Sequence, residues 1–369
     1  RDTRAGACVL DGVSLRALEV ERTIRPGVGA DRSGDRSHPD RFHQSDRSLV
    51  GLFLGAPGKG SPRTPMGKRL LREWLVRPLG ERGAIERRQA GVAVLVEDRL
   101  LAEELAGALA KVQDVARIAG RVALDRAGPR EVLALARSLA CVPALGAALA
   151  NTPALASLRA PLETHGPDVA GLARGIVETF NDDAPAFIRD GGCFRKGVDA
   201  ELDEARGLQE DAGAWLMAYQ QRLSAEHNLP GLKSGYNKIF GFYLELPQAQ
   251  ARTAPAAFAR KQTLKNAERY TTPELREYEA KVMSADARAL ERERDLFRAV
   301  CARVTALLGA IAACADAIAA LDATLAFADR AVARGWVRPT VVDEPALEIA
   351  SGRHPVLEEV LGPDFVPND

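Results

Sequence analysis

The residues best suited to chemistry lie in one stretch, Gly231 to Leu275, which mixes basic side chains with aromatic and amide side chains. The whole chain has 50 basic and 50 acidic residues and is formally neutral. Between Gly231 and Tyr270, however, basic residues exceed acidic residues by seven to two. The basic residues are Lys233, Lys238, Arg252, Arg260, Lys261, Lys265 and Arg269. Lysine and arginine neutralise phosphates while amides and hydroxyls donate to phosphate oxygens, so this composition indicates a phosphate-binding surface.

The same stretch predicts a small antiparallel sheet between about Leu232 and Tyr270. Tyr236 to Leu246 is rich in aromatic and aliphatic residues, which favour strands. Gly235 directly precedes this run and Gly241 lies within it, and a glycine in a strand indicates a bulge or the close approach of another segment. A solvated hairpin whose charges only keep it soluble is the alternative, because a basic patch alone is a weak signal.

Helical patterns flank the predicted sheet on both sides. From Val198 to Ala225 apolar residues recur every three or four positions, which predicts one continuous helix with a coiled-coil-like stripe. Thr272 and Pro273 are suited to start a second helix, and Leu275 to Ala289 continues the stripe. The sequence therefore predicts a mainly α protein in which two long antiparallel helices hold a small antiparallel β-sheet.

The remainder of the chain favours a helical core. Thr64 can cap a helix whose first residue is Pro65. The Ala-rich run from Val300 to Ala328 contains Arg303, Asp316 and Asp322, so a buried helix is a better interpretation than a membrane span. The polar segment from Arg25 to Arg47 has little to bury and is typical of a solvated loop.

No catalytic or metal-binding pattern is present in the sequence. The run Gly55-Ala56-Pro57-Gly58-Lys59-Gly60-Ser61 fails the spacing of a phosphate loop, which places serine or threonine directly after Gly-Lys. The five cysteines include no Cys-x-x-Cys pair, so they predict neither a zinc site nor a disulfide framework and suit a reducing compartment. We therefore expect no enzymatic activity, no catalytic residue and no metal site in this chain.

Several long segments resemble the bacterial MutS mismatch-repair proteins. Tyr236-Asn237-Lys238-Ile239-Phe240-Gly241-Phe242-Tyr243 and Gln262-Thr263-Leu264-Lys265-Asn266-Ala267-Glu268-Arg269-Tyr270 resemble the clamp of that family. The segment TPMGKRLLREWLVRPL, which begins at Thr64, is similar to its core domain. Gly352-Arg353-His354-Pro355-Val356 resembles the entrance to its ATPase domain, whereas the segment from Arg25 to Arg47 departs from the family as an insertion.

The resemblance implies a division of the chain into five parts. These are a helical core at 1–190 with the insertion at about 25–47, a descending lever helix at 191–230, a β clamp at 231–272, an ascending lever helix that returns to the core at 273–335, and the start of an α/β ATPase domain at 336–369. In the last part Leu347-Glu348-Ile349 alternates like a strand, and Phe365 is a candidate nucleotide contact in a complete protein. The chain has no initial Met, and the phosphate loop of the family would follow Asp369, so we expect a piece of a longer protein.

The clamp resemblance implies a grip on the backbone of duplex DNA, including mismatched duplexes. The candidate contacts are Lys233, Asn237, Lys238, Arg260, Lys261, Gln262, Lys265, Asn266 and Arg269. Reversing the charge of Lys261 and Lys265 should weaken binding to matched and mismatched duplexes alike. It should leave the helical content intact, because exposed charges seldom contribute much to folding. For the complete protein the resemblance implies ATP and Mg²⁺ as cofactors, a homodimer, downstream repair proteins as partners, and a location in the cytoplasm at the nucleoid. In this chain alone we expect no cofactor.

One further reading of the pattern is a structural module. In that hypothesis the paired helices form a coiled-coil-type arm that binds a protein partner and has no nucleic-acid role. An acidic tip poor in aromatic residues would favour it, whereas the tip here is basic and aromatic.

Overall fold

The computed structural model describes residues 8, 10–22, 48–54, 60–237 and 241–368. The polar segment at about 25–47, most of the Gly55–Ser61 run and Lys238 therefore lie outside the described residues. The chain divides into two compact units. The first unit comprises residues 1–127, 131–177 and 303–369, and the second comprises 128–130 and 178–302.

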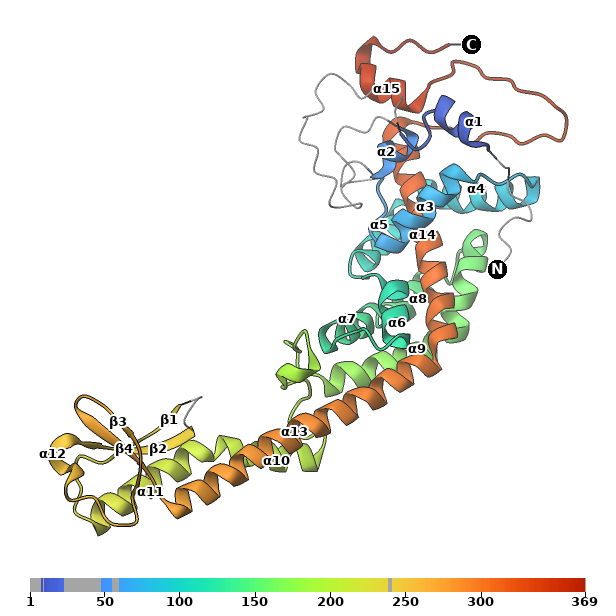
Figure 1. The fold of residues 1–369 in the computed structure, drawn as a ribbon. Coiled ribbons are helices and arrows are strands. Elements are labelled where there is room, and N and C mark those ends of the chain that lie inside the picture. Colours follow the sequence, from blue (N-terminus) through green and yellow to red (C-terminus); the bar gives the residue numbers. More distant parts are fainter. Residues whose placement is uncertain (1–7, 9, 23–47, 55–59, 238–240, 369) are drawn as a thin grey trace. The chain divides into compact units, whose positions relative to one another are not determined.

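The first unit is helical. All or most of each of the following elements belongs to it: α1 (Gly12–Ala17), α2 (Leu49–Leu54), α3 (Pro65–Val76), α4 (Arg82–Glu97), α5 (Arg99–Leu109), α6 (Val115–Ala123), α7 (Pro129–Leu139), α8 (Val142–Ala148), η1 (Pro153–Leu155), α9 (Ala156–Thr179), α14 (Leu308–Arg334), α15 (Pro355–Leu361) and η3 (Gly362–Asp364). Its central element is α14, which packs against α3, α4, α5 and α6 (Figure 1).

The Ala-rich run forms the end of α13 (Pro273–Ala306) and most of α14. Ile311, Ile318, Leu321 and Leu325 of α14 are buried, and alanines between them let neighbouring helices approach closely. By length and composition α14 and the stretch Pro129–Ala148 could each cross a membrane, but 67% and 50% of their most apolar windows are buried in the molecule. The expected buried helix is thus present in α14.

The start of α3 is held by a buried carboxylate from α14. The hydroxyl of Thr64 accepts a hydrogen bond from the Gly67 N–H at 2.9 Å, and Pro65 is the first helical residue, as expected. The carboxylate of Asp322 accepts from the backbone N–H of Arg63 at 2.9 Å, and from both the N–H and the hydroxyl of Thr64 at 2.7 Å. Burial of Asp322 raises its pKa. These bonds satisfy donors at a helix N-terminus that have no partner within the helix.

The second unit contains the sheet and most of its supporting helices. Its elements are η2 (Ile188–Asp190), α10 (Ala200–Glu210), α11 (Ala212–Glu226), β1 (Lys233–Asn237), β2 (Gly241–Pro247), α12 (Gln248–Ala251), β3 (Ala259–Thr263), β4 (Ala267–Thr271) and α13, whose last residues belong to the first unit. The strands form one antiparallel sheet in the order β1-β2-β4-β3. The predicted fold class, mainly α with a small antiparallel sheet, is confirmed.

The two helical arms of the second unit lie side by side, with α10 and α11 along α13 (Figure 1). The ring of Trp215 on α11 stacks on that of Tyr278 on α13, with centroids 3.6 Å apart. The first arm is not one continuous helix, because Asp211 separates α10 from α11. Aspartate has a low helix propensity in a helix interior, which the apolar stripe alone did not reveal.

The C-terminal residues contain no strand within the part of the chain that the structure describes. The expected strand at Leu347-Glu348-Ile349 is wrong: this segment is irregular, and Leu347 is 86% exposed. A strand without a pairing partner is not stable, and alternation in sequence does not supply a partner. The only bridge in these described residues joins Gly352 to Asn368.

Candidate nucleic-acid interface

One face of the sheet is buried against the helical arms. Phe242, Leu244 and Leu246 alternate along β2, are buried, and belong to the same apolar cluster as Tyr219 of α11 and Leu275 of α13. Because successive side chains of a strand point to opposite faces, the residues between them lie on the other side of the sheet. We call that side the outer face. The residues that strand register places on it include Lys233, Asn237, Tyr243, Glu245, Gln262 and Arg269.

A row of polar residues crosses the outer face from one edge strand to the other. In the strand register, Lys233 lies opposite Glu245, Glu245 lies opposite Arg269, and Arg269 lies opposite Gln262. The guanidinium of Arg269 donates to the Glu245 carboxylate at 2.9 Å and to the Gln262 side-chain oxygen at 3.1 Å. It also lies 4.0 Å from the centroid of the Tyr243 ring. Arg269 therefore organises the row, and its charge is already balanced by Glu245.

Lysines at two places on the sheet present charges that are not balanced internally. Lys233 begins β1 and Lys265 lies in the turn between β3 and β4, and both are exposed. Within the residues that the structure describes, neither side chain has an ion pair or a hydrogen bond. Asn266 is exposed in the same turn, and its carbonyl oxygen accepts from the Gln248 N–H at 3.2 Å.

Arg252 is a basic residue that the candidate set omits. It follows α12, which packs against β2 and β4, and it is exposed. Its guanidinium has no ion pair with any described residue. Composition could have identified Arg252, since it contributes to the basic surplus of this stretch, whereas the segments that resemble the clamp lie on either side of it.

Two of the candidate cations are directed away from the outer face. The ammonium of Lys261 lies 3.7 Å from the Glu279 carboxylate on α13 and 3.4 Å from the Phe242 carbonyl oxygen, and only 25% of the side chain is exposed. Arg260 pairs with Glu268 at 2.9 Å. Glu268 also accepts from the Tyr270 hydroxyl at 2.6 Å, and burial, followed by this hydrogen bond, raises the pKa of Tyr270.

A bulge explains why Arg260 and Gln262 do not share a face. Arg260 pairs with Tyr270, and Gln262 pairs with Arg269, so one extra residue, Lys261, is inserted into β3. Adjacent residues of β4 face opposite sides, and their partners must do the same. Arg260 therefore lies on the buried side of the sheet at its edge, whereas Gln262 lies on the outer face.

The glycines of β1 and β2 confirm the expected close approaches. Gly241 has a φ of +69°, and a Cβ there would collide with the Glu279 carboxylate. A Cβ on Gly235 would lie 2.7 Å from the Tyr243 ring. A side chain at position 241 would be strained by the positive φ and would displace the Glu279 carboxylate, and one at position 235 would displace the Tyr243 ring of the neighbouring strand.

Lys261→Glu should lower the free energy of unfolding by about 2 kcal/mol, because it removes a charged hydrogen-bonding group and places a second carboxylate beside Glu279. Lys265→Glu should change it by less than about 0.5 kcal/mol, because Lys265 is exposed in a turn. Urea denaturation of both variants measures the difference. The premise that both lysines are exposed is therefore wrong for Lys261, which is largely buried beside Glu279. Equal urea midpoints for the two variants would contradict a stabilising role of Lys261.

The remaining candidates are placed as follows. Asn237 ends β1 and is partly buried, and Lys238 lies outside the described residues. Phe365 is partly buried directly after η3, and its role as a nucleotide contact stays a prediction. Among the described residues no group of His, Cys, Asp or Glu side chains could hold a metal ion.

The fold and the interface together define a helical scaffold in which paired arms support a polar, partly basic sheet. The sequence model of MutS domain III matches residues 14–328. The chain thus belongs to the MutS family, and the matched part corresponds to domain III.

Two curated proteins illustrate the similarity. The DNA mismatch repair protein MutS of Chlorobium chlorochromatii (strain CaD3) is 41% identical over 328 residues, which are 88% of this chain and 37% of that protein. The DNA mismatch repair protein MutS of Rhodopirellula baltica is 37% identical over 368 residues, which are 99% of this chain and 38% of that protein. The chain thus spans less than two fifths of the length of these relatives.

Proposed function

We propose that the outer face of the sheet and the adjoining β3–β4 turn grip the phosphate backbone of duplex DNA. The main support is that Lys233 and Lys265 are exposed and have no internal partner in the described structure. The sheet beneath them is anchored to α11 and α13 by a buried apolar cluster, so the lysines are held on a rigid support. Relatives named as DNA mismatch repair proteins suggest DNA as the phosphate-bearing ligand.

The proposed contacts divide into two groups. The first group neutralises phosphates and consists of Lys233, Lys265 and Arg252. The second group consists of the side-chain amides of Asn237 and Asn266, which donate to phosphate or sugar oxygens. Arg269 positions Gln262 and Tyr243 on the outer face. Lys261 and Arg260 stabilise the sheet itself through their carboxylate partners. Backbone contacts do not read bases, so matched and mismatched duplexes should be gripped alike.

In complete proteins of this family we propose that this part couples DNA binding to an ATPase domain through the lever helices. The proposal keeps the core at 1–190, the levers at 191–230 and 273–335, and the clamp at 231–272. It also includes ATP with Mg²⁺, a homodimer, downstream repair proteins and a cytoplasmic location for the complete protein. We assign no catalytic step to this chain.

The affinity of the 369-residue chain for a fluorescent duplex should depend strongly on salt. If about three phosphates are neutralised, the logarithm of the binding constant should fall with the logarithm of the salt concentration at a slope of about −2.7. Lys233→Gln combined with Lys265→Gln should bring the slope to about −0.9, since each lost phosphate contact removes about 0.9. Titrations at several salt concentrations, with matched and mismatched duplexes, measure both slopes.

The matched control is Lys111→Gln, which removes an exposed lysine of the first unit and should leave the slope unchanged. A double variant that binds as tightly as the parent chain, with the same salt slope, would exclude this surface as the DNA contact. Binding that is insensitive to salt would favour the hypothesis of an arm that binds a protein partner.

A further inference from the structure

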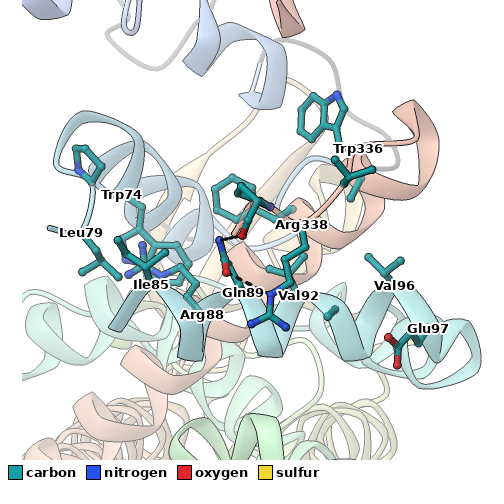
Figure 2. Close-up of a pocket in the computed structure, with 16 residues that line it drawn as sticks. Trp74, Leu79, Ile85, Arg88, Gln89, Val92, Val96, Glu97, Trp336 and Arg338 are labelled. Carbon is teal, nitrogen blue, oxygen red and sulfur yellow. Dashed lines mark hydrogen bonds between the residues drawn. The ribbon is translucent and has the colours of Figure 1, made fainter. Parts of the chain in front are cut away.

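The first unit contains a pocket of about 630 Å³ between α3, α4, the end of α14 and the segment that follows it (Figure 2). Its volume is within the range of sites that bind small molecules, about 300–1,000 Å³. The pocket is distant in sequence from the clamp and contains none of the candidate DNA contacts.

Most of the pocket wall is apolar. Ile85, Val92 and Val96 follow one another at helical spacing along one face of α4 and line the pocket (Figure 2). Trp74 of α3 and Phe327 of α14 contribute nearly parallel rings, with an interplanar angle of 4°. Such a wall suits a flat apolar ligand, because burial of apolar surface is favourable and non-directional.

The opposite wall is formed by the segment after α14 and is fixed by hydrogen bonds. The side-chain amide of Gln89 on α4 donates to the Pro339 carbonyl oxygen at 3.1 Å, and its oxygen accepts from the Arg338 guanidinium at 3.2 Å. These bonds hold Trp336 and its neighbours against α4, so the pocket has walls on both sides (Figure 2).

Arg88 supplies a positive charge inside this apolar pocket. Its guanidinium lies 3.6 Å from the centroid of the Trp74 ring, and within the described residues it has no ion pair and no hydrogen bond. Burial lowers the pKa of Arg88 to about 10, so the group remains charged at neutral pH in a partly desolvated site. Stacking on an indole compensates only part of the cost of desolvating a cation, and an anion would compensate more.

Among the other arginines near the pocket, Arg338 donates to the neutral Gln89 side chain and has no carboxylate partner among the described residues, whereas two more are neutralised. Arg82, at the start of α4, pairs with Glu86 and Asp343, and Arg99, at the start of α5, pairs with Asp329. The acidic residue of the pocket, Glu97, lies nine positions after Arg88, which is about 13 Å along the helix axis. The pocket is therefore polarised, with its positive charge at Arg88 and at Arg338, which is held by the neighbouring Gln89.

We propose that this pocket binds a small organic anion with a flat apolar body, whose carboxylate or sulfonate pairs with Arg88 while its ring lies against Val92, Val96 and Trp336. The site is separate from the proposed DNA contact, and its ligand class follows from the unpaired guanidinium and the apolar walls. Neutral molecules of the same shape should bind through the walls alone and should not depend on Arg88.

The test uses 1-anilinonaphthalene-8-sulfonate as the anionic probe and N-phenyl-1-naphthylamine as its neutral counterpart. Two of the three tryptophans, Trp74 and Trp336, line the pocket, so energy transfer from tryptophan to the probe reports binding there. We expect one saturable site for the anionic probe. Arg88→Gln should weaken that binding at least about tenfold and leave the neutral probe unaffected, because only the anion uses the charge.

Two further variants keep the result interpretable. Arg87→Gln removes the adjacent, exposed arginine of α4 and should leave both probes unaffected. Val96→Trp fills the pocket without changing Arg88 and should abolish binding of both probes, and it provides the decisive measurement if Arg88→Gln fails to fold by circular dichroism. Anionic-probe binding that is unchanged in Arg88→Gln or in Val96→Trp, or that never saturates, would overturn the proposal.

Discussion

Glu293→Ala should lower the free energy of unfolding of the second unit by about 3–5 kcal/mol, because it removes one partner of a buried ion pair. The Glu293 side chain lies on α13 and is 3% exposed. Its carboxylate accepts from the N–H of Gly192 at 2.9 Å and from that of Cys193 at 3.2 Å, and it pairs with Arg206 of α10. Alanine would leave these two amides without an acceptor and the guanidinium of Arg206 without its counter-ion.

Urea denaturation measures the loss of stability, and hydrogen exchange locates it. Exchange of the Gly192 and Cys193 amides should accelerate in the variant, because their acceptor has been removed. Glu291→Ala is the matched control: it removes an exposed carboxylate from the same helix and should change stability by less than about 0.5 kcal/mol. Equal stability of the two variants would show that Glu293 does not hold the arms together.

Glu293→Gln separates the charge from the hydrogen bonds. Glutamine keeps one acceptor oxygen for a backbone amide but loses the ion pair with Arg206. Its stability should therefore lie between those of the parent chain and Glu293→Ala. If the lever helices transmit DNA binding as proposed, this contact is one place where their pairing depends on a single side chain.

Asp322→Ala should destabilise the first unit by about 3 kcal/mol. Three donors, the N–H groups of Arg63 and Thr64 and the Thr64 hydroxyl, would lose their buried acceptor. Because Asp322 is fully buried, water cannot replace it without a local opening of the helix start. Thermal or urea unfolding measures the effect, and Glu103→Ala, which changes an exposed carboxylate of α5 in the same unit, is the control.

The stability difference between the parent chain and Asp322→Ala should also depend on pH. Burial raises the pKa of Asp322 above its ordinary value of 3.8, so the folded protein binds this proton more tightly than the unfolded chain does. The resulting stabilisation is complete below pH 3.8 and is lost as the pH rises through the raised pKa. The stability difference should therefore be larger near pH 4 than at pH 7. The opposite trend would show that the three hydrogen bonds to the carboxylate lower its pKa by more than burial raises it.

Local sequence patterns predicted the elements of this protein well. Thr64 and Pro65 begin α3 as their capping chemistry requires, and the aromatic and aliphatic run from Tyr236 to Leu246 correctly predicted strand structure, which β1 and β2 contain. Long family-specific segments predicted the order of core, arms and sheet. The patterns failed where a local signal was not enough: Asp211 interrupts the first arm, and Leu347-Glu348-Ile349 has no partner strand.

By itself, the sequence determined the helical class, the small sheet and the concentration of basic residues on it, because periodicity, capping and composition are local properties of the chain. The tertiary structure alone decided which charges are available to a ligand. Lys261 is neutralised by Glu279 and Arg269 by Glu245, whereas Lys233 and Lys265 remain exposed. The physical reason is that ion pairing and burial depend on residues brought together by folding, and one bulge in β3 changes which side of the sheet a side chain faces.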